Sequence, residues 1–195
     1  MSRPRSATGA ALTRDRLLAS AREVVAERGW AAATSRAIAD HAGVNLALIN
    51  YHFRSKDQLL IAALDRAMLE LSDAEAPPPR VAWAGLRKLA LEFIDVHGES
   101  PQIRVLFEAT LHAGRDPELA AAVRVHLDAF RHFAAHAVES AAKQGAFAPG
   151  TDPKSLGVAV AALLDGLILH RMIDPQTDIA AALRTALDAW TTPSA

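Results

Sequence analysis

Apolar residues recur along this chain at the spacing of a helix. Leu17, Ala21, Val24 and Val25 stand at positions i, i+4, i+7 and i+8, which lie on one side of an amphipathic helix. Alternation of apolar and polar residues, which would indicate a strand, never lasts more than a few positions. The pattern therefore predicts an all-α protein of about nine helices with no internal repeat.

Helix-capping residues and helix breakers predict where the first helices begin and end. Thr13 is expected to cap the first helix, and Gly29 is expected to terminate it. Thr34 is expected to cap a short helix over residues 35–42, and Gly43 is expected to allow the tight turn that follows.

The later helices carry similar signals. Asn45 is expected to cap a third helix over residues 46–52, and a longer fourth helix is expected over residues 57–72. The segment "EAPPPR", residues 75–80, is expected to be a linker, because consecutive prolines cannot continue a helix. Three further helices are expected to begin with a capping residue followed by proline, at Ser100-Pro101, Asp116-Pro117 and Asp152-Pro153.

The two short helices on either side of Gly43 have the size and turn of a helix-turn-helix, whose second helix lies in the major groove of DNA. The apolar residues expected to form the shared core of this pair are Ile38, Ala42, Val44, Ile49 and Phe53. With these side chains inside, the residues left on the opposite face of the third helix are Leu46, Ala47, Asn50 and Tyr51. That face is expected to contact DNA.

Each residue type on this face suits a part of DNA. Asn50 can both donate to and accept from a base edge, most naturally adenine, while Leu46 and Ala47 can contact thymine methyl groups. The side chains that can donate to phosphate oxygens are Thr34, Ser35, Tyr51, His52 and Lys56. The alternative interpretation is that Tyr51 and His52 are ordinary boundary residues of a helical domain and that Leu46 packs on a neighbour.

The charge distribution separates the chain into two parts. Residues 1–56, here called the head, carry nine Lys/Arg and four Asp/Glu, a net charge of +5. Residues 57–195, here called the body, carry 12 basic and 18 acidic residues, a net charge of −6. A basic head on an acidic body predicts that only the head contacts a polyanion.

Other features of the composition narrow the class of protein. The chain has no cysteine, which excludes disulfides and suits a reducing cytosol. The longest apolar run, "SLGVAVAALLDGLILH", contains Asp165 and is shorter than the roughly 20 residues of a membrane span, so a buried helix is expected. His132 and His136 are one helical turn apart, near His126 and Glu139. That spacing can bind a divalent metal, but the sequence fixes no complete ligand set, and no metal is predicted.

The segment "TSRAIADHAGVNLALINYHFRSKDQLL" resembles the helix-turn-helix signature of TetR-family transcriptional regulators. The shared features are a Thr/Ser-started helix, Ile-Ala, Ala-Gly-Val, a polar cap, an aromatic cluster ending in Phe, and Ser-Lys-acid before two leucines. The resemblance is strong over residues 13–60 and architectural beyond them. The sequence departs from the common pattern at Asn45, where Ser or Thr is usual, and at Asn50, where tyrosine is frequent, so the operator sequence cannot be predicted.

The resemblance implies a DNA-binding domain over residues 1–56 and a helical ligand-binding and dimerisation domain over residues 57–195. It implies a cytoplasmic regulator, most often a repressor, that binds a near-palindromic operator as a homodimer. The complete set of expected DNA-binding residues is Thr34, Ser35, Arg36, Asn45, Leu46, Ala47, Asn50, Tyr51, His52 and Lys56.

The implied dimer forms through the last two helices, about residues 153–174 and 177–190. The penultimate helix is apolar on nearly all sides, so it needs burial beyond one face. A second copy of the chain would supply that burial, and the alternative is a core within one chain. The body is also implied to bind a small-molecule effector that releases DNA, for which the candidate residues are Phe93, Phe107, Phe130, Phe133 and His170.

Two other functions remain as alternatives. A helical enzyme or small-ligand carrier would use His97, His112 or Asp165 for acid–base chemistry, but no nucleophile elbow, phosphate loop or paired-carboxylate motif supports an enzyme. An interaction module would bind an acidic protein through the basic head. No catalytic residue and no cofactor is predicted.

Overall fold

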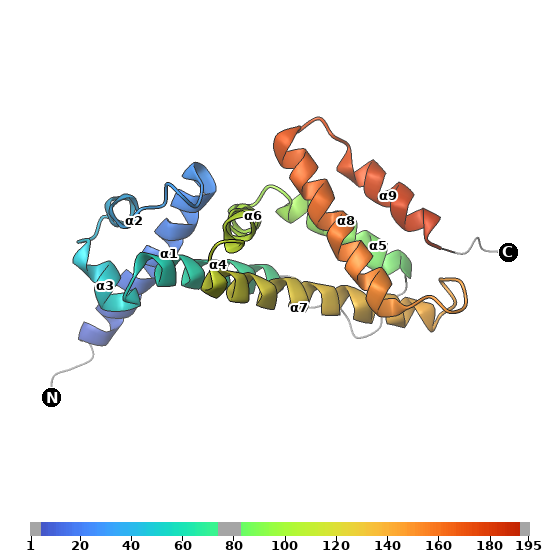
Figure 1. The fold of residues 1–195 in the computed structure, drawn as a ribbon, viewed down its shortest axis with the longest axis horizontal. Helices are drawn as coiled ribbons and strands as arrows, with labels where there is room; N and C mark the ends of the chain where they lie inside the picture. The colour runs from blue at the N-terminus through green and yellow to red at the C-terminus, as the bar shows by residue number, and fades with distance from the viewer. Residues whose placement is uncertain (1–4, 74–82, 192–195) are drawn as a thin grey trace. The chain divides into compact units, whose positions relative to one another are not determined.

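The computed structural model describes residues 5–73 and 83–191, and these residues form nine helices and no strand (Figure 1). The all-α prediction is therefore confirmed. The helices are α1 (Arg5–Arg28), α2 (Ser35–Ala42), α3 (Ala47–Phe53), α4 (Lys56–Asp73), α5 (Trp83–His97), α6 (Pro101–Ala113), α7 (Pro117–Ala142), α8 (Pro153–Ile173) and α9 (Ile179–Ala189).

The chain divides into two compact units that are each built from two stretches of sequence. The first unit comprises Met1–Glu75 and Ser100–Arg124, and the second comprises Ala76–Glu99 and Val125–Ala195. The helix α6, which was predicted to belong to the body, therefore packs with α1 and α4 in the first unit. The predicted boundary after residue 56 rests on the charge distribution and on the family resemblance, and it stays a prediction. The predicted linker, residues 75–80, lies outside the described residues.

The first unit is built around α1. The predicted stripe of Leu17, Ala21, Val24 and Val25 is at most 1% exposed, and α2, α4 and α6 pack against this helix. The helix ends at Gly29 as predicted, because Gly29 has a φ of 82° that favours glycine. Gly29 N–H donates to the Val25 carbonyl at 2.9 Å.

The predicted start of α1 is wrong. The helix begins at Arg5, so Thr13 lies inside it. Thr13 Oγ1 donates to the Gly9 carbonyl at 2.9 Å, one turn earlier, instead of accepting a bond from a helix N–H as a cap does. The three proline-marked caps are confirmed, since Ser100, Asp116 and Asp152 each accept backbone N–H groups of the first turn at 3.0–3.3 Å.

The second unit contains α5, α8, α9 and most of α7. The apolar stripe of α9, Ile179, Leu183 and Leu187, is at most 2% exposed, and α9 packs on α5 and α8. Asp178 Oδ1 caps α9 by accepting from Ala181 N–H at 2.8 Å. Gly157 of α8 lies so close to α7 that a Cβ atom there would be 2.5 Å from the backbone nitrogen of Ala135, so only glycine permits this approach.

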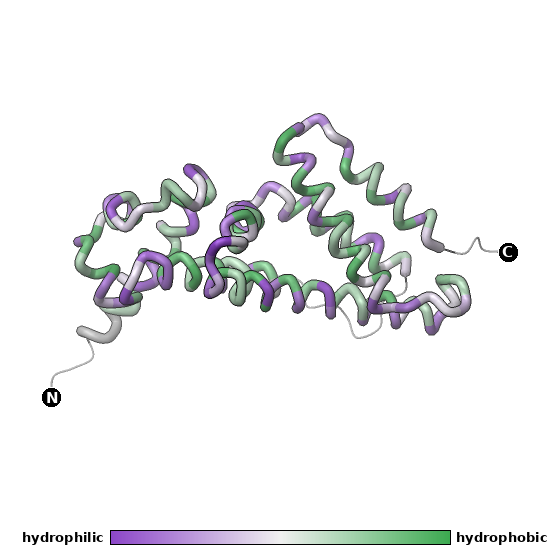
Figure 2. The backbone as a smooth tube through the Cα atoms, in the orientation of Figure 1, coloured by the Kyte–Doolittle hydropathy of each residue, from purple (hydrophilic) through white to green (hydrophobic). Residues whose placement is uncertain are grey.

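The helix α8 is longer than the apolar run in the sequence suggested. It has 21 residues and is long and apolar enough to cross a membrane by length and composition, so the argument from length was wrong. Figure 2 shows hydrophobic residues along much of α8. Its contacts with α5 and α9 and the partly buried Asp165 in its middle support a place in a helical unit instead.

Candidate nucleic-acid interface

Local hydrogen bonds build the turn between α2 and α3. Thr34 Oγ1 accepts from Ala37 N–H at 3.1 Å and begins α2 as predicted. Gly43 ends α2 with a φ of 62°, and the next N–H, that of Val44, donates to the Ala39 carbonyl at 3.0 Å. Asn45 Oδ1 then accepts from Ala47 N–H at 2.8 Å, which fixes the start of α3. The third helix runs one residue later than predicted, from Ala47 to Phe53.

Two arginines of α1 brace this turn. Arg16 Nη2 donates to the Ala42 carbonyl at 2.5 Å, at the end of α2. The Arg14 guanidinium lies 5.1 Å from the centre of the Phe53 ring, at the end of α3, within the range of a cation–π interaction. From the sequence, both arginines contributed only to the net positive charge predicted for the head. Their effect is to hold α2 and α3 at fixed positions on α1.

The shared core of α2 and α3 is largely as predicted. Ile38, Ala42, Ile49 and Phe53 are at most 6% exposed. Val44 was expected in this core, but it is only partly buried, because it lies in the turn, where its side chain is not enclosed by either helix. Phe53 and Ile49 thus orient α3 with its other face toward solvent.

The opposite face of α3 is open. Tyr51 is 76% exposed and Leu46 is 48% exposed, and Asn45, Ala47 and Asn50 are exposed beside them. The exposure of Leu46 does not favour the alternative that this side chain packs on a neighbour. Tyr51 also fits poorly with the interpretation as a boundary residue, since three quarters of it is accessible. We call the surface of Asn45, Leu46, Ala47, Asn50 and Tyr51 the α3 face.

The other side chains expected to donate hydrogen bonds to DNA phosphates lie before and after the α3 face along the chain. Thr34 and Arg36 are exposed and Ser35 is partly buried at the start of α2. His52 is also partly buried, and its ring lies nearly perpendicular to the Tyr51 ring, with the ring centres 4.9 Å apart. Lys56 is partly exposed at the first position of α4, and its Nζ lies 3.4 Å from Asp57 Oδ1.

Arg54 is a basic residue that the prediction of DNA contacts left out. It is exposed and directly follows α3, with a φ of 67° that few side-chain-bearing residues adopt. Its N–H donates to the Asn50 carbonyl at 3.1 Å. The signal that could have found it is its position between the aromatic cluster and Lys56 within the basic head.

Polar contacts join α4 and α6 to α1 within the first unit. Arg22 Nη1 lies 2.6 Å from Glu70 Oε2, and Gln102 Nε2 donates to the same oxygen at 3.1 Å. Burial acts to raise the pKa of Glu70, but hydrogen bonds from Arg66 and Gln102 and the charge of Arg22 hold it below its ordinary value. Glu70 is therefore ionised at neutral pH and ties three helices together.

A second connection links α6 to the end of α1. The backbone N–H of Trp30 donates to Glu108 Oε2 at 2.8 Å. The Trp30 and His112 rings stack with their centres 6.4 Å apart. His112 was considered as an acid–base group in the enzyme alternative, but here its Nδ1 lies 2.9 Å from the Glu108 carbonyl oxygen.

The expected effector residues are distributed over both units. Phe107 belongs to the first unit, and the other four belong to the second. Phe93 and Phe130 stack at a centroid distance of 6.3 Å, whereas His170 is exposed. Among the residues described, no group of three His, Cys, Asp or Glu side chains is arranged to hold a metal ion.

Comparison with known families identifies the helix-turn-helix. The model of bacterial regulatory proteins of the tetR family matches residues 17–63. The model of the C-terminal part of BetI-type transcriptional repressors matches residues 82–192, more than half of the chain. The chain belongs to the TetR family. TetR-family proteins are regulators and not enzymes, so the enzyme alternative is wrong.

Individual relatives agree with this membership. The TetR-family chain is 34% identical over 120 residues to the transcriptional activator FasR of Mycolicibacterium smegmatis, covering 60% of this chain and 54% of FasR. It thus spans about half the length of that relative. A TetR-family regulator structure from Rhodococcus sp. is 26% identical with a TM-score of 0.74, covering 92% of this chain and 98% of the other. A regulator structure from Saccharomonospora viridis in complex with choline is 22% identical with a TM-score of 0.76, covering 92% and 95%, and shares the fold.

Proposed function

We propose that this chain is a cytoplasmic, ligand-responsive transcriptional regulator that binds a near-palindromic DNA operator as a homodimer. The observation that carries the proposal is the α3 face, which is exposed on the second helix of a helix-turn-helix braced by α1. The match to BetI-type repressors supports repression as its mode of action. FasR, which is named an activator, shows that relatives of this chain also include activators.

The residues of the α3 face and its surroundings divide between two roles. Asn50 is proposed to read a base edge, with Leu46 and Ala47 contacting thymine methyl groups. Tyr51 is proposed to contact phosphate. The other proposed phosphate contacts are Thr34, Ser35, Arg36, His52 and Lys56. Asn45 is proposed to contribute mainly by fixing the start of α3, where Ala47 N–H already occupies its Oδ1.

The two roles predict different mutant behaviour. Lys56→Ala should weaken binding to specific and unrelated DNA by a similar factor and reduce the salt dependence of binding, because a phosphate contact carries no sequence information. Asn50→Ala should weaken operator binding by roughly 10-fold or more but leave binding to unrelated DNA nearly unchanged. Fluorescence anisotropy with both DNAs at two salt concentrations measures these effects. Equal losses on both DNAs for Asn50→Ala would contradict the base-reading role.

The proposed dimer rests chiefly on α8. Four apolar residues share one exposed side of this helix at spacings of four, seven and four: Val158, Ala162, Leu169 and Ile173. Only 28% of the most apolar stretch of α8 is buried within the chain. The apolar stripe of α9, by contrast, is already covered by its own chain. A second copy packed against α8 would bury the remaining apolar side, in accordance with the homodimers typical of the family.

The dimer proposal predicts that Leu169→Glu will yield a monomer. Leu169 is 42% exposed, so the change should leave the fold of one chain intact while placing two like charges at the symmetric interface. Sedimentation velocity should show half the mass, and operator affinity should fall at least 10-fold because one reading helix is lost. Val96→Glu on α5, where Val96 is 66% exposed, is the matched control. Sedimentation of Leu169→Glu as a dimer would contradict the assignment to α8.

The proposed response to ligand is a shift of population between DNA-competent and DNA-incompetent states. An effector that binds the incompetent state a few kcal/mol more tightly would suffice for release. The contacts of Glu70 and Glu108 support α4 and α6 as the elements that carry the change to α1. The choline found in the S. viridis neighbour supports a small organic molecule as the kind of effector.

A further inference from the structure

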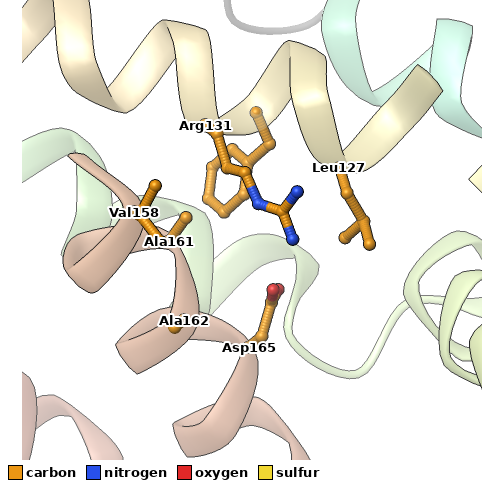
Figure 3. Close-up of a pocket in the computed structure, with 7 residues that line it drawn as sticks. Leu127, Arg131, Val158, Ala161, Ala162 and Asp165 are labelled. Carbon is orange, nitrogen blue, oxygen red and sulfur yellow. The ribbon is translucent and has the colours of Figure 1, made fainter. Parts of the chain in front are cut away.

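A small cavity lies between α7 and α8 in the second unit. Its volume is about 60 Å³, and its walls are mostly apolar, with Leu127, Phe130, Val158 and two alanines among the lining residues. The charged residues that line it are Arg131 from α7 and Asp165 from α8. Figure 3 shows these two side chains pointing toward one another. The cavity therefore presents one positive and one negative group to anything inside it.

Asp165 is the unusual member of this lining. Its carboxylate has no hydrogen-bond or ion-pair partner among the residues that the structure describes. Burial raises its pKa to about 6, and the charge of Arg131 acts in the opposite direction. A partly buried carboxylate without a hydrogen-bond donor is less favourable in its ionised form than one in water. A positively charged group inside the cavity would therefore be favoured next to Asp165.

Arg131 is held on its own helix. Its Nη1 lies 3.1 Å from Asp128 Oδ1, one turn earlier on α7. This contact engages one side of the guanidinium and leaves other N–H groups available. Those donors can bind an acid group of a ligand, because guanidinium and carboxylate geometries match.

We propose that this cavity binds a small zwitterion, with its ammonium group against Asp165 and its acid group against Arg131. A simple cation would be attracted by Asp165 but repelled by Arg131, and a simple anion would meet the reverse. Only a ligand that carries both a positive and a negative charge can pair with both Asp165 and Arg131. Its identification as the effector rests on the proposed function, whereas binding to the cavity does not.

The size of the cavity limits the ligand. The volume of about 60 Å³ is well below the roughly 150 Å³ of an engineered protein cavity that binds benzene. Few non-hydrogen atoms can therefore separate the two charges, which selects α-amino acids and their shortest homologues. Longer ligands would have to extend past Val158 and Ala162, which lie on the exposed side of α8 that a second copy covers in the proposed dimer.

Titration calorimetry on the full-length chain at pH 8 tests the proposal. The probes are glycine, β-alanine and 4-aminobutyrate, compared with methylammonium and acetate, which carry one charge each. At least one zwitterion should bind 10-fold or more tightly than either single-charge probe. Asp165→Asn and Arg131→Gln should each lower that affinity at least 10-fold. The matched controls, Glu139→Gln and Arg124→Gln, remove exposed charges of α7 outside the cavity. They should leave the zwitterion affinity unchanged.

The pH dependence provides a second readout. The affinity of the cavity for zwitterions should fall as the pH drops below about 6, because protonation removes the negative charge of Asp165. Asp165→Asn should lose this dependence. The other titratable groups near this part of α7 are Asp128 and the exposed His132, whose Nδ1 lies 2.6 Å from the Asp128 carbonyl oxygen. His132→Gln should therefore retain the pH dependence of the unmodified protein.

Several results would overturn the proposal. If methylammonium bound with the same affinity as the zwitterions, and bound more tightly to Arg131→Gln than to the unmodified protein, the cavity would be a simple cation site. Zwitterion binding that survives both cavity variants would place the site elsewhere, and no binding by any probe would leave Asp165 and Arg131 as a structural pair. Operator affinity is measured separately. A zwitterion that binds but does not release DNA would reject only its role as effector, whereas failure to bind any operator would reject the proposed function itself.

Discussion

Ala47→Glu is expected to abolish operator binding, with a loss of roughly 100-fold or more. Ala47 is exposed at the first position of α3, in the middle of the α3 face. A carboxylate there would be pressed against the negative charge of DNA, and like charges brought together at an interface cost several kcal/mol. The folded chain itself should be unaffected, because an acidic residue in the first turn of a helix is favourable.

The control for this prediction is Ala121→Glu. Ala121 is exposed on α7 in the first unit, so the same substitution adds the same charge on a helix that contributes no residue to the α3 face. Anisotropy titrations should show operator binding within a few-fold of the unmodified protein for this control. If Ala47→Glu bound the operator as well as the control does, α3 would not be the DNA-reading helix.

Gly157→Ala is expected to destabilise the second unit by roughly 1–3 kcal/mol, the range of overpacked core sites. A Cβ atom at this position would be 2.5 Å from the Ala135 nitrogen and 2.6 Å from its Cα. These are backbone atoms of α7, so the clash cannot be relieved by a side-chain rotation. The two helices would have to separate, and separation would remove contacts along their whole crossing.

Gly166→Ala is the comparison that isolates this effect. It lies in the same helix, and a Cβ atom there would meet nothing within 4 Å. Alanine should stabilise the helix at that position by about 0.5–1 kcal/mol, because glycine has more conformational freedom to lose. Urea denaturation of both variants at one protein concentration measures the difference. Equal stability of the two variants would mean that α7 and α8 do not cross closely at Gly157.

Local signals in the sequence predicted the helix-turn-helix well. Thr34, Gly43 and Asn45 each act through hydrogen bonds or backbone angles within a few residues, so neighbouring sequence contains all that is needed. Thr13 shows the limit of such signals. A threonine hydroxyl can begin a helix or bond back to the carbonyl one turn earlier, and the residues before it decide which.

Contacts between distant segments could not be predicted from pattern. Nothing in the sequence indicates that Arg16 would reach the end of α2 or that Glu108 would accept the Trp30 N–H, 78 residues away. The same holds for Asp165, which the sequence singled out as a charge within the longest apolar run and as a possible acid–base group. Its meeting with Arg131 depends on how α7 and α8 cross, and that crossing depends on Gly157.

The most direct test of the proposed function is selection of bound sequences from a random DNA pool by the purified full-length protein, repeated at two salt concentrations. The proposal predicts one enriched near-palindromic motif, with half-sites separated by about one helical turn for a dimer, and weaker recovery at the higher salt. A folded protein that enriches no motif at either salt would contradict DNA reading by the α3 face.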